Sequence, residues 1–144
     1  MAAVLAPPEP PATRGRRMLA PALTIGGLGL ATLALRLRDP HQHASWGLCP
    51  SAALGVYCPG CGGLRAVNDL TNGQVGAALS SNLLVTLLIP VAVVLLLLWT
   101  VDRWRGHERR PDWQRLRPAV IGFVVVAVVF AVLRNTAYGA WLAP

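Results

Sequence analysis

The sequence has no lysine, little charge of either sign and no stretch in which apolar and polar residues alternate. Charged residues make up 13% of the 144 positions, whereas hydrophobic residues make up 54%. Such a balance excludes an ordinary soluble domain, and the missing alternation argues against β-strands. The sequence also shows no Ser-His-Asp set, phosphate-binding loop or pair of carboxylates, which weakens the case for an enzyme.

Arginine supplies all 13 basic residues, and the net charge is +7. A nucleic-acid-binding protein would need a basic face on a folded soluble element. Here the arginines lie beside apolar segments instead. We therefore expect them to contact anionic lipid headgroups, and we expect no nucleic-acid partner.

Three apolar runs, residues 18–35, 83–101 and 118–133, contain no charged side chain. At about 1.5 Å per residue, the first two cover most of a bilayer core that is about 30 Å thick. The third run is shorter, and it spans the bilayer if Arg134 extends its side chain to the surface. The sequence therefore predicts an all-α integral membrane protein with three transmembrane helices.

The three helices are expected to form one membrane domain, residues 18–144, preceded by a disordered arm at residues 1–17 that carries arginines. The first run is longer than the apolar part of a usual secretory signal, which favours an uncleaved anchor. Glycines at 26, 27 and 29 would let another helix approach this one closely. Self-association or binding to a membrane protein partner is therefore expected.

The arginine counts on the connections predict the orientation. Three arginines precede the first helix and six lie between the second and third, against three in the loop of residues 36–82 and one after the third helix. Positively charged residues concentrate on the cytoplasmic side of short connections. We therefore expect a cytoplasmic N-terminus, with the loop and the C-terminus outside the cytoplasm.

The loop contains the only dense run of chemically capable residues, the Cys-Pro-Gly-Cys sequence at residues 58–61, called the CPGC turn below. Two thiols three positions apart can close a disulfide or supply two of the four ligands of a metal ion. Leucine and valine spacing from Leu64 onward predicts a short interfacial helix directly after the turn. A helix N-terminus beside the sulfurs would favour thiolate over thiol.

A second short interfacial helix is expected through Val75, Ala78 and Leu79, with Thr71 or Asn72 as its N-terminal cap. The cysteine loop therefore contains one or two short helices that lie at the membrane surface.

Three interpretations of Cys58 and Cys61 remain open. Outside the cytoplasm a structural disulfide is favoured, either between them or with Cys49, ahead of a reactive dithiol and a metal site. The odd number of cysteines leaves one for a mixed disulfide with a partner or a dimer. A zinc site would combine Cys49, Cys58 and Cys61 with His41 or His43, although the sequence contains only one of the two knuckles that a zinc ribbon needs. No cofactor is expected otherwise.

The segment around the cysteines resembles a family of small bacterial membrane proteins, domain of unknown function 2752. The resemblance covers about residues 48 to 100. It departs at Leu64, where the family usually has threonine, and at Leu83, where proline commonly follows the asparagine. The matching residues are Cys49-Pro50, Gly55-Val56-Tyr57-Cys58-Pro59-Gly60-Cys61-Gly62, Arg65-Ala66, Leu70, Gly73 and Asn82. The resemblance implies a bacterial cell membrane as the location and importance for the two cysteines and Arg65, and it implies no reaction.

Four further polar residues stand near the loop or the helix ends. Arg65 either holds an anionic group near the thiols or pairs with Asp69, which follows it at the i,i+4 spacing of a helix. Asn82 is expected to be a cap or turn residue at the start of the second transmembrane helix. Arg134 is hypothesised to reach into the cysteine loop, the alternative being an arginine that only extends to the membrane surface.

These features favour a non-enzymatic membrane protein that acts in assembly or as a scaffold, with the cysteine loop as its contact surface. A membrane protein that exchanges thiols and disulfides is the first alternative. A metal-binding membrane protein is the second. Transport is disfavoured, because none of the three apolar runs contains an acidic residue.

Overall fold

The computed structural model describes residues 13–42, 51, 54–107 and 112–142, and every structural statement below concerns these residues. They form an all-α structure, and no strand occurs among them, as predicted. In chain order the elements are α1 (Arg14–Leu37), α3 (Gly63–Thr71), α4 (Val75–Ser81), α5 (Leu83–Arg105), α6 (Trp113–Arg134) and the 3₁₀ helix η2 (Ala137–Leu142).

Three of these helices, α1, α5 and α6, are long and apolar enough to cross a membrane, which confirms the three predicted spans. All three are longer than the uncharged runs, with 24, 23 and 22 residues. Arginine is a good helix former whose aliphatic stem stays on an apolar surface while its charged head reaches water. Helix α5 therefore continues through its terminal arginines to Arg105.

Two helices begin before their expected boundaries. Helix α1 begins at Arg14, so the last residues of the predicted disordered arm are helical, and residues 1–12 lie outside the described part. Helix α6 begins at Trp113 and not at Pro118. Its start is set by Asp112, whose side chain accepts a hydrogen bond from the backbone N–H of Gln114 at 3.0 Å, as N-terminal caps do.

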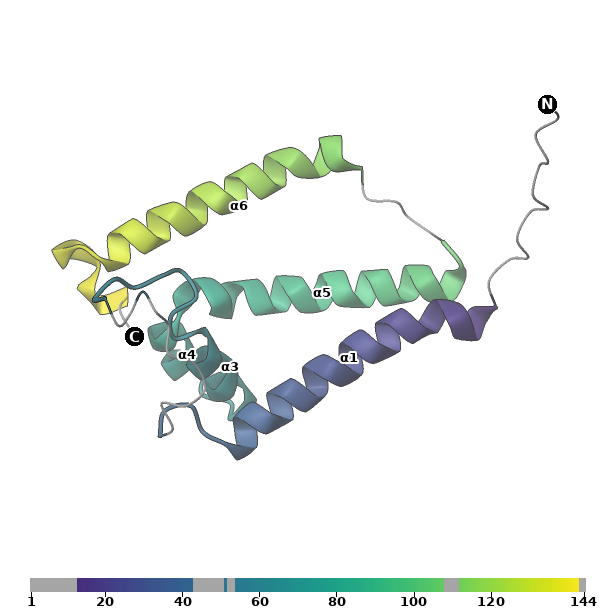
Figure 1. Cartoon of the computed structure of the whole chain (residues 1–144), viewed down its shortest axis with the longest axis horizontal. Coiled ribbons are helices and arrows are strands. Elements are labelled where there is room, and N and C mark those ends of the chain that lie inside the picture. Colours follow the sequence, from purple (N-terminus) through teal and green to yellow (C-terminus); the bar gives the residue numbers. More distant parts are fainter. Residues whose placement is uncertain (1–12, 43–50, 52–53, 108–111, 143–144) are drawn as a thin grey trace, which may run out of the picture.

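The spans share one polar end and one arginine-rich end (Figure 1). At the first end, α3 and α4 fill the space between the end of α1 and the start of α5, and η2 lies beside them. At the other end, the start of α1 meets the end of α5, where the Arg14 guanidinium lies 4.7 Å from the ring centre of Trp104. The cysteine loop and η2 thus lie at the same end, as expected for segments separated by two spans; which end faces the cytoplasm stays a prediction.

Little of each span is covered by the rest of the chain. In the most apolar windows of α1, α5 and α6, only 11%, 6% and 6% of the residues are buried. The glycines at 26, 27 and 29 have no atom within 4 Å of an added Cβ, so within the described chain they pack against no other helix. Their role in binding a second chain stays a prediction, and the outward faces are open to lipid or to other helices.

Short helices α3 and α4 confirm the expected interfacial pair, but not its capping. Asn72 closes the end of α3, where its side-chain amide donates to the Asn68 carbonyl at 3.0 Å, and the N-cap of α4 is Gln74. The chain turns sharply at Gly73, with φ +74°, before α4 can start, which moves the cap beyond both predicted residues.

Hydrogen bonds tie this pair to the spans. The Asn68 amide of α3 donates to the Leu35 carbonyl near the end of α1, at 2.7 Å. The Arg36 guanidinium of α1 donates to the Thr71 carbonyl at the end of α3, at 3.1 Å. The Thr86 hydroxyl of α5 donates to the Ala78 carbonyl of α4, at 2.8 Å. The short helices are therefore fixed to the spans at the polar end.

Candidate functional site

The CPGC turn is a tight backbone turn directly before α3. The Cys61 N–H donates to the Cys58 carbonyl at 3.1 Å, and the Cys58 N–H donates to the Cys61 sulfur at 3.2 Å. Gly62 then takes a left-handed conformation, with φ 80°, and forms the N-cap of α3. A residue with a Cβ is disfavoured in this conformation, so the glycine allows the turn to lead directly into the helix.

The two cysteine sulfurs lie side by side but are not joined to each other. Their Sγ atoms are 3.1 Å apart, whereas the bond of a disulfide is about 2.05 Å long. Cys58 is half-buried, and Cys61 is only 7% exposed. The predicted disulfide between these two residues is therefore not present in this structure, and the alternative pairing with Cys49 lies outside the described residues. Cys58 is thus the more exposed residue of this close pair, and Cys61 is the more covered one.

Arg134, the last residue of α6, reaches the turn, which confirms the hypothesis drawn from the sequence. One terminal nitrogen of its guanidinium donates to the carbonyls of Cys58 and Cys61, each at 3.1 Å, and the other donates to the Cys61 carbonyl at 3.1 Å. The side chain is 2% exposed, and its charged group lies 5.0 Å from the ring centre of Phe130. Arg134 does not simply extend to the membrane surface, because its charged head is buried against the turn.

Asn82 reaches the same turn from the start of α5. Its amide nitrogen donates to the carbonyls of Pro59 and Cys61, at 2.8 and 2.9 Å, and its side-chain oxygen accepts from the Val85 N–H at 2.9 Å. The predicted cap is confirmed. Beyond capping, the fully buried side chain links the start of α5 to the CPGC turn.

Asn135 adds a third connection just after α6. Its side-chain oxygen accepts from the Tyr57 N–H, and its amide nitrogen donates to the Tyr57 carbonyl, both at 2.9 Å. One side chain thereby satisfies both backbone polar groups of the residue that precedes Cys58. Asn135 therefore binds the backbone just before Cys58, and the neighbouring Arg134 binds the Cys58 carbonyl.

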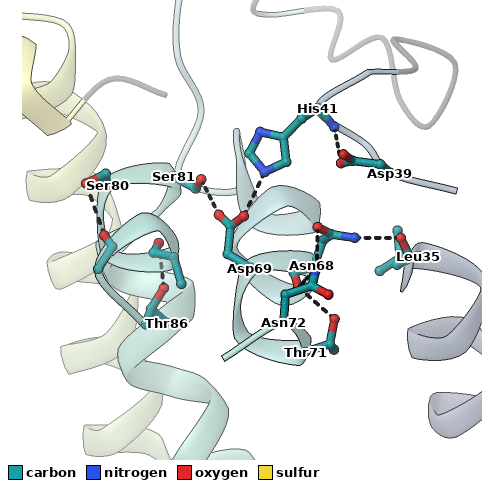
Figure 2. Close-up of polar contacts among 12 residues, drawn as sticks. Leu35, Asp39, His41, Asn68, Asp69, Thr71, Asn72, Ser80, Ser81 and Thr86 are labelled. Atoms are coloured by element: carbon teal, nitrogen blue, oxygen red, sulfur yellow. Dashed lines mark hydrogen bonds and ion pairs between the residues drawn. The ribbon is translucent and has the colours of Figure 1, made fainter. Parts of the chain in front are cut away.

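A second polar cluster surrounds Asp69 of α3, which is 3% exposed (Figure 2). One carboxylate oxygen lies 2.8 Å from the His41 ring nitrogen Nε2, and the other accepts from the Ser81 hydroxyl at 2.7 Å. The carboxylate is thus the middle member of the group. In a catalytic triad the histidine lies between the serine and the carboxylate. Here the carboxylate lies between the histidine and the serine, so the group joins three chain segments and does not activate the serine.

The expected pair between Arg65 and Asp69 does not form. The carboxylate of Asp69 is engaged by His41 and Ser81, and the Arg65 side chain is exposed. Burial explains the difference, because a buried carboxylate needs close partners inside the protein, whereas an exposed arginine is hydrated. The interpretation of Arg65 as a holder of an anionic group stays a prediction.

The weaker candidates for zinc binding are only partly visible. Cys49 and His43 lie outside the described residues, and His41 contacts Asp69. In the part of the chain that the structure describes, no three side chains of His, Cys, Asp or Glu come together as a metal site would require. A zinc site that includes the missing residues stays a prediction from the sequence.

Several residues of the polar end had no clear signal in the sequence. Ser81 and Asn68 look like ordinary helix residues, and their contacts depend on how α3 packs against α4 and α1. Asn135 had a weak signal, since a polar pair directly follows the apolar run of α6. Such a pair is costly to bury unless its groups are hydrogen-bonded.

Comparison with known protein families gives a match over part of the chain. Residues 49–96 match the model of the family described as Protein of unknown function (DUF2752). No curated protein and no solved structure matches the chain. The matched segment contains the CPGC turn, α3, α4 and the first half of α5, and it supports the resemblance seen in the sequence. Arg134 and Asn135 lie outside it.

Proposed function

We propose that this multi-pass membrane protein exchanges thiols and disulfides with a partner protein through its CPGC turn. The observation that carries the proposal is the placement of the two sulfurs: they lie 3.1 Å apart, and Cys58 is half-buried while Cys61 is covered. A purely structural disulfide needs no accessible sulfur. An exchange site needs one sulfur to attack a partner and a second within reach to complete the reaction.

The exchange proceeds in two balanced steps. The Cys58 thiolate attacks one sulfur of a partner disulfide, so that a mixed disulfide forms and the other partner sulfur leaves as a thiolate. The Cys61 thiolate then attacks the Cys58 sulfur, which releases the first partner sulfur and closes the disulfide within the CPGC turn. The turn gives up two electrons and two protons, and the partner disulfide becomes a dithiol. A second dithiol protein reverses these steps and restores the reduced turn.

The surroundings of the turn suit this chemistry. Arg134 and Asn82 donate five hydrogen bonds to its carbonyls, so the backbone that positions the sulfurs is fixed. The N-terminus of α3 follows the turn directly, and its partial positive charge stabilises negative charge that develops on sulfur. On the orientation that the arginine counts favour, the partner is an exported or membrane protein outside the cytoplasm.

Trapping tests the proposal directly. In a Cys49→Ser background, the additional Cys61→Ser substitution removes the second step, so the mixed disulfide at Cys58 should accumulate in membranes. Cys58→Ser is the matched control, since it removes the attacking sulfur and should trap nothing. Absence of any trapped protein with Cys61→Ser would count against exchange.

The reduction potential provides a second test. Exchange proteins have potentials of about −270 to −120 mV, whereas structural disulfides lie below about −300 mV. Titration of the purified Cys49→Ser protein against glutathione or dithiothreitol buffers should place the turn in the first range. A value in the second range would identify a structural staple.

A second candidate is the assembly or scaffold role, with the CPGC turn as a contact surface that transfers no electrons. The open sides of the spans favour this role, because only 6–11% of the residues in their most apolar windows are buried. In this case a partner should co-purify in mild detergent with the variant in which both Cys58 and Cys61 are serine. Loss of the partner with that variant would instead favour exchange.

A further inference from the structure

The guanidinium of Arg134 is a buried positive charge with no carboxylate beside it in the part of the chain that the structure describes. Its three hydrogen bonds all go to the carbonyls of Cys58 and Cys61, and its Nε atom is buried without a hydrogen-bond partner. A buried cation normally has a full negative charge as its partner, because carbonyl dipoles replace only part of its lost hydration.

Acidic groups near Arg134 are few. Its other contacts are the rings of Phe130 and Tyr57, which offset part of the charge through their π-electrons. The groups whose negative charge would act on the guanidinium are Cys61, Cys58 and Tyr57.

We propose that Arg134 is a positioning residue for the CPGC turn: its charge stabilises negative charge on the two sulfurs, and its hydrogen bonds keep them within reach of each other. The proposal rests on the proposed function in so far as the turn is reactive. It makes α6 part of the site, although the match to the known family ends in α5. A merely structural role, in which Arg134 only attaches the end of α6 to the loop, is the alternative.

Two substitutions separate charge from hydrogen bonding. Arg134→Gln keeps a side-chain N–H donor and loses the charge, whereas Arg134→Lys keeps the charge and loses the planar fork that reaches two carbonyls. Arg117→Gln removes the charge of an exposed arginine near the other end of α6 and serves as the matched control. All variants carry Cys49→Ser, and helix content and elution in detergent show which of them fold.

The rate of Cys58 alkylation by iodoacetamide, measured in the reduced full-length protein from pH 6 to 10, is the readout. Near pH 7 we expect Arg134→Gln to react about tenfold more slowly than the parent, the change that one pH unit in thiol ionisation produces. The Cys58 rates of Arg134→Gln and of the parent should converge at the highest pH, where this thiol is ionised in both proteins. We expect Arg134→Lys to stay within about threefold of the parent and Arg117→Gln to be unchanged.

A structural role predicts a different pattern. If Arg134→Gln and Arg134→Lys change the rate alike and by the same factor at every pH, the charge has no effect on the sulfurs and the proposal is overturned. An unchanged rate in both variants overturns it as well. Should Arg134→Gln not fold, Arg134→Lys decides alone, because a tenfold loss at pH 7 that persists at pH 10 contradicts a role of the charge.

Failure of this proposal is distinguishable from failure of the proposed function. Alkylation needs no partner protein, so a pH-dependent effect of Arg134→Gln without any trapped partner supports the positioning role and rejects exchange. A trapped partner together with an unchanged alkylation profile supports exchange and rejects the role of Arg134.

Discussion

Replacing Asn82 by alanine removes three hydrogen bonds that one fully buried side chain makes. The Cys61 carbonyl keeps its two bonds from Arg134. The Pro59 carbonyl and the Val85 N–H lose the partner that Asn82 gave them. We therefore expect the CPGC turn and the first turn of α5 to loosen together.

The magnitude follows from the groups that are left without partners. Loss of an N-cap costs about 1 kcal/mol, and a buried carbonyl without a partner costs about 1–3 kcal/mol. Asn82→Ala should therefore reduce the free energy of unfolding by about 2–4 kcal/mol. Asn82→Ser keeps a capping oxygen and loses only the bonds to the turn, so it should cost about 1–3 kcal/mol.

Alkylation of Cys61 reports the loosening locally. Its sulfur belongs to a residue that is 7% exposed, so the reagent reaches it mainly when the turn opens. Every 1.4 kcal/mol corresponds to about a factor of ten, and a loss of about 2 kcal/mol should raise the alkylation rate roughly 30-fold. Trypsin cleaves after Arg38 and Arg65 and releases the three cysteines in one peptide, whose fragmentation assigns each modification.

Asp112→Ala is the matched control, because it removes the N-cap of α6 at the arginine-rich end and touches no residue of the turn. It should lower the free energy of unfolding by about 1 kcal/mol and leave the alkylation rate of Cys61 unchanged. The reasoning is refuted if Asn82→Ser leaves the Cys61 rate at the parent value. It is also refuted if Asp112→Ala raises that rate as much as Asn82→Ala does.

Three further predictions concern the same end of the protein. Gly62→Ala should lower the free energy of unfolding by about 1–2 kcal/mol and speed the alkylation of Cys61, because Gly62 has φ 80°. An unchanged midpoint of unfolding, measured in detergent, would contradict this. Asp69→Leu should lower the free energy of unfolding by about 2 kcal/mol or more, because it leaves the buried Ser81 hydroxyl without its acceptor. Asp69→Asn should lower it less. Equal unfolding midpoints for the two variants would argue that the cluster does not stabilise the protein. A membrane-impermeant maleimide should label Cys58 from outside intact cells, and labelling only in inverted vesicles would reverse the predicted topology.

Much of the fold is predictable because membrane spans are recognised by composition. An uncharged run of about 20 residues has few alternatives to a transmembrane helix. The boundaries are less predictable, since arginine and tryptophan at the surface neither stop nor start a helix. The end of α5 at Arg105 and the start of α6 at Trp113 depend on caps, and the sequence signals of caps are short.

Only the local part of the site is predictable. The spacing of Cys58 and Cys61 is visible in the sequence, whereas the bonds from Arg134 join residues that are 73 and 76 positions apart. The pairing of Asp69 shows the same limit. Helical spacing offered Arg65 as a near partner, but burial selected His41, which is 28 positions away. Contacts of this kind follow from how the helices are arranged in three dimensions.

The polar end acts as one unit because the backbone of the CPGC turn is partly buried within it. Buried backbone carbonyls need hydrogen-bond donors from the protein. Here the donors to the CPGC turn come from the start of α5 and the end of α6, through Asn82 and Arg134. The spans bury little of each other along their length, so these bonds are what fixes their ends relative to the sulfurs. A change that moves α6 at this end must therefore also move the carbonyls that position Cys58 and Cys61, which couples the arrangement of the spans to the positions of the two sulfurs.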